Sequence, residues 1–274
     1  RISSFFGDEY IMGSFVVRLL PLLFFSLLWI NIKQTFFYLI LFGIFIISGI
    51  LIMLSGERVA LLLFFIIFTI LILLKKFRIF FFINILFFLT IFSYFIQDKN
   101  VKERYFGNIN KNYFENKELI FFTEEHHSMM ITSLKIIKSN LFFGTGSKSF
   151  RYLCKKDEFK TITYPSNDVG QEDIGCSTHP HNIFLQIFVE FGLIGIIFFL
   201  IIFIKVFLRL CNSINEYNKL ESPLYKNIEL SKSILYLSLF INIFPIIPSG
   251  NFFNNWFSII LYLPIGFILS LEKK

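Results

Sequence analysis

The chain has 274 residues, of which 55% are hydrophobic and 41 are Phe, while only 16% are charged. A soluble domain typically carries about a quarter charged residues, and a chain of this length has too small an aqueous core for so much Phe, Leu and Ile. The composition excludes an ordinary soluble protein, and the net charge of +7 then reflects loop Lys and Arg that set membrane orientation, not nucleic-acid binding.

Seven apolar runs predict helices that cross a bilayer, for which about 20 residues are needed. In chain order they cover residues 14–32, 36–54, 59–74, 79–96, 183–208, 231–247 and 255–271. The pattern predicts an all-α, polytopic transmembrane helical bundle, with membrane domains of about four helices at 1–97 and about three at 183–274, and one large loop at 98–182. Because the chain starts at Arg1 without a signal peptide, we interpret it as lacking N-terminal spans.

Basic residues in the short loops predict the orientation of these spans. If the seven spans alternate in direction, the following basic residues all fall on one side of the membrane, which is then cytoplasmic: Lys33, Lys75, Lys76, Arg78, Lys205, Arg209, Lys219, Lys226, Lys273 and Lys274. The large loop then faces outward. Cys154 and Cys176 lie in it, where an oxidising compartment allows a bridge, whereas Cys211 lies on the cytoplasmic side. We expect one disulfide between Cys154 and Cys176, with two unpaired thiols as the alternative.

Within the loop, residues 128–139 predict an amphipathic helix. Met130, Leu134, Ile137 and Leu141 recur at helical spacing and would form its apolar face, on the bilayer surface or against the membrane domain. Gly144 and Gly146, in the sequence FFGTGS, then favour a helix stop and a tight turn over a phosphate-binding loop, since the Walker Lys is absent.

Several polar residues are predicted at the outward membrane surface: Arg58 at the head of a span, Arg18 inside the first span, and the sequence HPHN at 179–182. Glu190, two turns into the fifth span, is a possible partner of Arg18. Each has a plain alternative, because Arg58 could contact headgroups, Arg18 and Glu190 could form a structural pair, and Asn182 could be an N-cap. A His at this position can work as a base at physiological pH.

The run HPHNIFLQIFVEFGLIG, residues 179–195, resembles the signature of the O-antigen ligase and O-antigen polymerase superfamily, in which His-Asn is followed after nine residues by Gly-x-x-Gly. His181, Asn182, Gly192 and Gly195 fit that spacing. The turn SGER at 55–58, the stretch GDEYIMGSFVVRLLP at 7–21 and the stretch PSGNFFNNW at 248–256 also resemble family members.

The resemblance implies a bacterial inner-membrane glycosyltransferase for surface polysaccharide or lipopolysaccharide, with a periplasmic active site. Its donor would be a glycan on undecaprenyl diphosphate and its acceptor a sugar hydroxyl, on lipid A-core or another glycan, and no cofactor or metal is expected. Arg58 matches the arginine that holds the donor diphosphate, and His181 the histidine that assists the acceptor. At the position of a second family arginine, this chain has His126. The role of that arginine could also be taken by His127, Arg151 or Arg18.

Ligase, polymerase and protein O-oligosaccharyltransferase remain open, because all three share the donor. A metal-dependent membrane hydrolase is a less favoured alternative, in which zinc ligands come from His126, His127, His179, His181, Glu124, Glu125 and the two Cys. No HExxH or paired CxxC sequence supports it. A lipid-linked sugar transporter would use the broken stretch 244–251, but no inverted repeat is evident.

Overall fold

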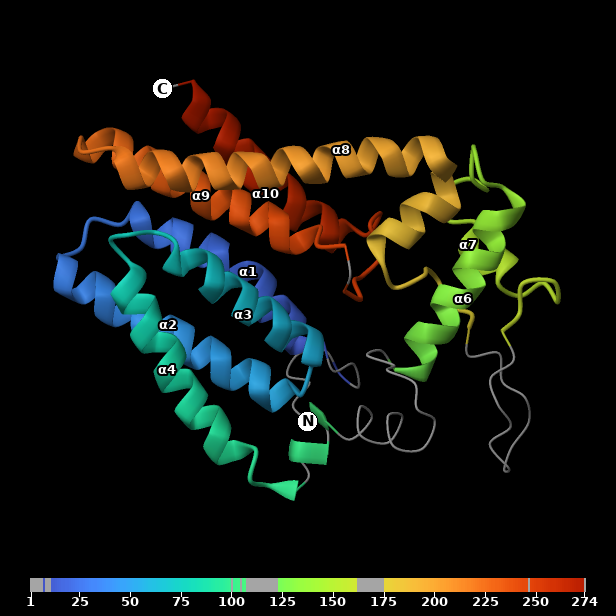
Figure 1. Cartoon of the computed structure of the whole chain (residues 1–274), viewed down its shortest axis with the longest axis horizontal. Helices are drawn as coiled ribbons and strands as arrows, with labels where there is room; N and C mark the ends of the chain where they lie inside the picture. Colours follow the sequence, from blue (N-terminus) through green and yellow to red (C-terminus); the bar gives the residue numbers. More distant parts are fainter. Residues whose placement is uncertain are drawn as a thin grey trace. The chain divides into compact units, whose positions relative to one another are not determined.

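The computed structural model describes residue 7 and residues 11–99, 101–103, 105–106, 123–161, 175–245 and 247–273. The regular elements of these described residues are all helices (Figure 1). This confirms the all-α class. The helices are α1 (Met12–Leu28), α2 (Gln34–Ser55), α3 (Arg58–Ile72), α4 (Arg78–Phe95), α6 (Glu124–Ser139), α7 (Phe150–Leu153), α8 (Ile183–Lys219), α9 (Pro223–Asn242) and α10 (Asn255–Glu272).

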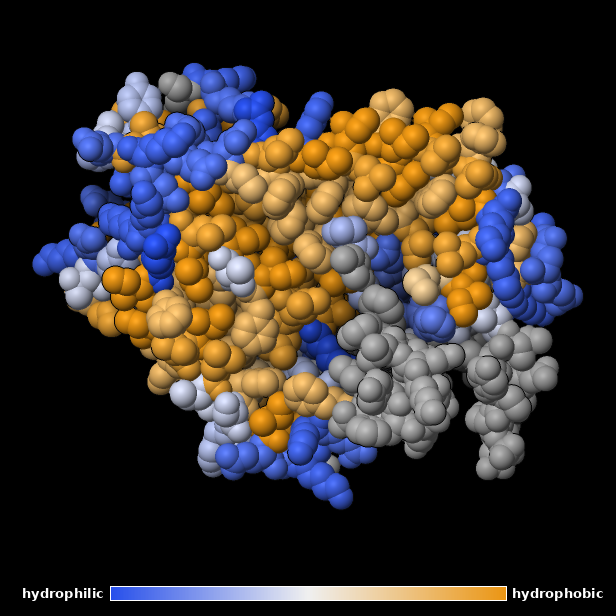
Figure 2. All heavy atoms as spheres, viewed as in Figure 1, coloured by the Kyte–Doolittle hydropathy of each residue, from blue (hydrophilic) through white to orange (hydrophobic). Residues whose placement is uncertain are grey.

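Each predicted span overlaps one helix of the structure. Four of them, α2, α4, α8 and α10, are long and apolar enough to cross a membrane, while α1 and α3 are apolar but shorter. Figure 2 shows a broad apolar surface on the visible face of the molecule. On α8, Ile194, Phe198 and Ile202 are among the exposed apolar side chains. Exposed apolar area of this extent fits lipid rather than water. The protein is therefore a multi-pass membrane protein, and the count of seven spans stays a prediction.

The chain forms two compact units. Unit 1 comprises Arg1–Gly107, Lys205–Asn242 and Ile259–Lys274, and unit 2 comprises Asn108–Ile204 and Ile243–Ser258. The first part of α8 and the segment before α10 thus group with the large loop. These units are defined by packing, so they leave the predicted membrane boundaries at 1–97, 98–182 and 183–274 untested.

Aromatic side chains fill the core of unit 1, where α1 packs on α2, α3 and α9. Phe45 lies 5.1 Å from Phe81 and 6.4 Å from Phe24, measured between ring centroids. Edge-to-face contacts of this kind add about 0.5–1.5 kcal/mol each beyond area burial. Gly49 makes room in α2, because a Cβ there would lie 2.7 Å from the Phe88 ring. The Phe content therefore supplies the packing of this bundle.

Two helix boundaries differ from the prediction. The sixth run was expected at 231–247, but α9 ends at Asn242, since Pro245 lacks an amide hydrogen and disfavours the helical conformation of the residue before it. The fifth run was expected to end at Leu208, but α8 continues to Lys219. There Asn218 accepts a hydrogen bond from the Lys75 amide at 2.8 Å, which ties the end of α8 to the loop between α3 and α4.

The predicted amphipathic helix exists as α6, and the residues of its predicted apolar face divide between two environments. Ile137 is buried in a stripe with Met129 and Ile136 together with Ser128, Thr132 and Ser133, whereas Leu134 and Leu141 are exposed, so their contact with the bilayer stays a prediction. Two of the three buried hydroxyls in this stripe are bonded within the described residues. Thr132 bonds to Thr161 at 2.7 Å, and Ser133 donates to the Met129 carbonyl at 2.7 Å. The helix therefore packs inside unit 2 on Phe150, Phe159 and Val189.

Candidate functional site

Arg58 belongs to a turn that is fixed against α1 in unit 1. Gly56 adopts the left-handed conformation with φ 70° and ends α2, which brings Glu57 to the start of α1. The Glu57 carboxylate accepts hydrogen bonds from the Ser14 amide at 3.2 Å and from the Ser14 hydroxyl. A carboxylate at a helix N-terminus is favoured there by the unsatisfied amides. Arg58 then opens α3, half-buried, with its Nη1 atom buried.

Arg18 is buried within α1 and bonded at the end of α9. Its Nη1 donates to the Asn242 carbonyl at 3.3 Å and to the Asn242 side-chain oxygen at 3.1 Å. Arg18 belongs to unit 1 and Glu190 to unit 2, so the predicted pair of Arg18 and Glu190 stays a prediction. The bonds to Asn242 show a structural role for Arg18.

In unit 2, Asn182 connects the start of α8 to the segment after α9. Its side-chain oxygen accepts a hydrogen bond from the Leu185 amide at 3.0 Å, which makes it the N-cap of α8. Its amide group donates to the Pro245 carbonyl at 2.8 Å and to the Ile247 carbonyl at 3.2 Å. Asn182 therefore acts as the N-cap, and the same side chain also binds the backbone of the segment that follows α9.

His181 has a backbone conformation that is uncommon for residues other than glycine, with φ 52°. Its carbonyl accepts a hydrogen bond from the Ser249 amide at 2.8 Å, and its ring Nε2 lies 3.2 Å from the Ser177 hydroxyl. Such conformations persist where surrounding contacts determine them, and they concentrate at functional sites. The neighbouring bonds of Asn182 and Ser249 supply that constraint here.

Three imidazoles gather at this point. The ring of His181 stacks on that of His179 at 4.1 Å and meets that of His126 edge-on at 5.4 Å, between centroids. Burial lowers the pKa of His181 to about 3, with the charges of His179 and His126 adding to the effect, and burial likewise lowers the pKa of His179 to about 4. Burial also lowers the pKa of His126. All three rings are therefore neutral at physiological pH.

Two of these imidazoles, those of His126 and His181, border a cavity of about 270 Å³. Its lining is apolar except for two His and one Asn: His126, Met130, Pro180, His181, Asn182, Phe184, Leu185, Pro245 and Pro248. Thr123 caps α6, and its hydroxyl lies 2.6 Å from Nδ1 of His126, which fixes that ring at the cavity. A mostly apolar pocket with a few fixed polar groups is the usual form of a small-molecule site.

Gln186, one turn along α8 from Asn182, joins α8 to the segment 251–252. Its amide nitrogen donates to Asn251 at 2.9 Å and to Glu190 at 3.1 Å, and its oxygen accepts from the Phe252 amide at 2.9 Å. Glu190 is buried, and within the described residues its second carboxylate oxygen has no hydrogen-bond partner. Glu190 is thus held by Gln186, a residue that no sequence motif marks as functional.

Gly192 breaks α8 at the position where the loop after α6 docks. Its φ of 64° and ψ of −159° are non-helical, and a Cβ there would overlap the Phe142 carbonyl. Across the break, the Leu193 amide donates to the Leu141 carbonyl at 2.8 Å, and the amides of Thr145 and Gly146 donate to α8 carbonyls at 2.9 Å. The expected turn at Gly144 and Gly146 is present, with positive φ at both. Gly192 therefore permits docking of this loop against α8.

A disulfide joins Cys154, at the end of α7, to Cys176, and Cys211 has a free thiol. The bridge fixes the segment that leads through Ser177 to His179 and His181. Among the described residues, no group of three or more His, Cys, Asp or Glu is arranged to hold a metal ion. The side chain of Glu124, named in the zinc alternative, lies outside the described residues.

The structure brings His126, His181, Asn182 and Glu190 into unit 2, and places Arg18 and Arg58 in unit 1. Arg151 lies on α7 in unit 2, in a separate basic groove. The predicted convergence of Arg58 and His181 on one site stays a prediction. Sequence reasoning missed Thr123, Ser177, Gln186 and Ser249, because common polar residues without a motif give no sequence signal.

None of the curated proteins matches the chain closely enough to count as a relative. Residues 43–200, which include the turn at 55–58 and the His-Asn sequence at 181–182, match the family described as O-antigen ligase. The match covers more than half of the chain, and the protein therefore belongs to the O-antigen ligase family.

Proposed function

We propose that this protein is a membrane glycosyltransferase of the bacterial inner membrane that transfers a glycan from undecaprenyl diphosphate to a sugar hydroxyl. The acceptor would be lipid A-core or another glycan, and the active site would face the periplasm. One observation carries the proposal: a constrained, neutral His181 borders an apolar cavity in a family of ligases. Polymerisation of repeat units or transfer to a protein would use the same donor.

In the proposed reaction, His181 accepts the proton of the attacking hydroxyl. A sugar hydroxyl is a weak acid, so it must lose its proton as the new glycosidic bond forms, and a neutral imidazole is a suitable base. With a pKa of about 3, His181 is neutral but weakly basic. A diphosphate placed nearby would raise that pKa, since negative charge favours the imidazolium. Donor binding would thus strengthen the base at the moment it is needed.

Arg58 is proposed to bind the leaving diphosphate. Cleavage of the anomeric C–O bond leaves negative charge on the diphosphate, and a guanidinium can stabilise it through two parallel hydrogen bonds without a metal. The Glu57 carboxylate bonds the turn that carries Arg58 to the start of α1, so the backbone from which the guanidinium extends is fixed. His126 is proposed to contribute to substrate binding, from its place on the cavity wall.

The test is transfer from undecaprenyl-diphosphate-linked glycan by purified variants that elute as the wild type does in size-exclusion chromatography. Arg58→Lys keeps the charge but loses the planar fork, and transfer should fall roughly 10- to 100-fold. His181→Ala should abolish transfer while donor binding persists. His127→Ala is the matched control, because His127 lies one residue from His126 but does not line the cavity.

Near-normal transfer by His181→Ala would exclude this residue as the base. Transfer should also be insensitive to a chelator, and loss of activity with chelator, restored by zinc, would favour the metal-dependent alternative. Loss of activity in His127→Ala equal to that in His181→Ala would show that the assay reports general damage to unit 2.

A further inference from the structure

A second, larger hollow lies in unit 2, around α7 and the disulfide. It has a volume of about 680 Å³, and among the described residues its lining contains no acidic side chain: Arg151, Tyr152, Lys155, Lys160, Cys176, Ser177 and Thr178. Three cationic side chains, two hydroxyls and one exposed aromatic ring therefore face the same space. The roles proposed above for Arg58, His126 and His181 leave this groove without a function.

The charges of the groove are only partly balanced within the described residues. Lys160 pairs with Asp157 at 2.6 Å. No ion pair involves Arg151 or Lys155 in the part of the chain that the structure describes, and Nε of Arg151 is buried there without a hydrogen bond. The charges of Arg151 and Lys155, which line the groove, would attract an anion placed in it.

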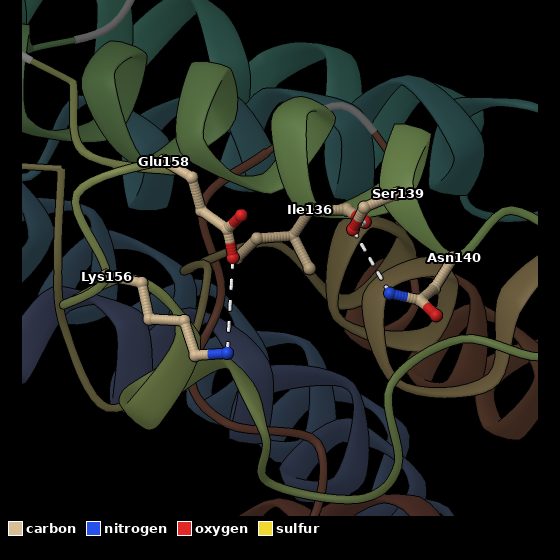
Figure 3. A network of polar contacts seen from close by, with 5 residues as sticks. All are labelled: Ile136, Ser139, Asn140, Lys156 and Glu158. Atoms are coloured by element: carbon tan, nitrogen blue, oxygen red, sulfur yellow. Dashed lines mark hydrogen bonds and ion pairs between the residues drawn. The ribbon is translucent and has the colours of Figure 1, made fainter.

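Among the described acidic side chains near the groove, Asp157 pairs with Lys160 and Glu158 pairs with Lys156, so neither balances Arg151 or Lys155. Figure 3 shows Lys156 paired with Glu158 at 4.0 Å, beside the buried Ile136 of α6, and neither member of that pair lines the groove. Lys135 donates instead to the Lys160 carbonyl, which fixes the backbone of the groove wall to α6. The groove therefore keeps at least two cations without acidic partners among the described residues.

Two groove residues contact the imidazole cluster directly. The Ser177 hydroxyl lies 3.2 Å from Nε2 of His181, and the Thr178 hydroxyl lies 3.0 Å from Nδ1 of His179. The positive charge of Arg151 also contributes to the lowered pKa of His179, after the larger effect of burial. A ligand in the groove would thus lie within a few residues of the proposed base.

We propose that this groove binds an anionic substituent, a phosphate or a carboxylate, on the sugar acceptor. Arg151 and Lys155 would bind the anion, and the exposed ring of Tyr152 offers a flat amphipathic surface for the sugar. The identity of the ligand as acceptor rests on the proposed function, because His181 acts there on the acceptor hydroxyl. The groove would then select acceptors by charge.

The binding test uses the full chain in detergent, titrated by calorimetry with glucose 6-phosphate, glucuronate and glucose. Both anionic sugars should bind at least about 10-fold more tightly than glucose, and high salt should weaken them. The double variant Arg151→Gln/Lys155→Gln should lose roughly 10-fold or more of that affinity. Lys138→Gln, which removes an exposed cation of α6 outside the groove, is the matched control. Equal binding of glucose and glucose 6-phosphate, or an unchanged double variant, would overturn the proposal.

The transfer assay separates acceptor from donor. In the double variant, KM should rise for a phosphorylated acceptor and stay unchanged for its dephosphorylated form and for the donor, with kcat retained. A rise in the donor KM instead would show that the groove holds the donor diphosphate, and would overturn the acceptor assignment. If wild-type protein transfers no glycan, the proposed function fails, and the calorimetric result still decides whether the groove binds anionic sugars.

Discussion

Substitution of Gly192 by Ala tests how the structure fixes α8 next to the His cluster. The φ of 64° and ψ of −159° at Gly192 lie in a region that is essentially restricted to glycine, and a side chain there costs about 1–3 kcal/mol. The new Cβ would also overlap the Phe142 carbonyl and would lie 2.5 Å from the Gly144 amide nitrogen. Since both contacts are backbone atoms, the docked loop must move.

Movement of the loop would break backbone hydrogen bonds. The bond from Leu193 to the Leu141 carbonyl is 2.8 Å long, and those from Thr145 and Gly146 to α8 are 2.9 Å long. At about 0.5–1.5 kcal/mol each, loss of two or three adds about 1–4 kcal/mol to the conformational cost. We therefore expect Gly192→Ala to destabilise the protein by roughly 2–7 kcal/mol.

The assay is thermal unfolding in detergent, combined with hydrogen exchange at the amides that dock the loop. These are the amides of Thr145, Gly146 and Leu193, and that of Ile194, which donates to the Phe142 carbonyl at 3.5 Å. Gly43→Ala is the control, because Gly43 lies in regular α2 helix with nothing within 4 Å of a Cβ, and Ala there should be neutral or slightly stabilising. Gly192→Ala should unfold at clearly lower temperature and lose protection at the amides of residues 145, 146, 193 and 194. Equal stability of the two variants, with protection retained, would refute the steric argument.

Two further predictions concern pH and orientation. Because the pKa of His179 falls from 6.5 to about 4 on folding, its contribution to stability is complete above pH 6.5 and is lost as the pH falls toward 4, by on the order of 3 kcal/mol. Stability against unfolding, measured between pH 7 and 4.5, should therefore fall less steeply in His179→Asn than in the wild type. Parallel curves for the two proteins would contradict this. Single cysteines at exposed Glu125 and Lys76, in a cysteine-free protein, should react from the periplasm and from the cytoplasm respectively with an impermeant thiol reagent, and labelling of both from one side would contradict the predicted orientation.

Some features follow from local physics and were predictable from the sequence. Long apolar runs must form helices in lipid, since every backbone group needs a partner there, and seven helices coincide with the seven runs. The N-cap at Asn182 and the turn at Gly144 are likewise local, because each depends on bonds or dihedral angles within a few residues. The family could be recognised for a similar reason: its His-Asn and Gly-x-x-Gly elements lie within one continuous run.

Other features depend on contacts between distant residues, and only the tertiary structure decided them. The buried face of α6 could not be assigned from hydrophobic spacing, because it includes Thr132, a polar residue that is buried through its bond to Thr161. The break at Gly192 exists because residues 141–146 dock there, and helical periodicity gives no sign of that loop. Spacing singled out His181, but its constrained backbone comes from Ser249, 68 positions further along the chain. Sequence determined which segments are helical and which residue types are available; the bonds between segments determined which of those residues meet.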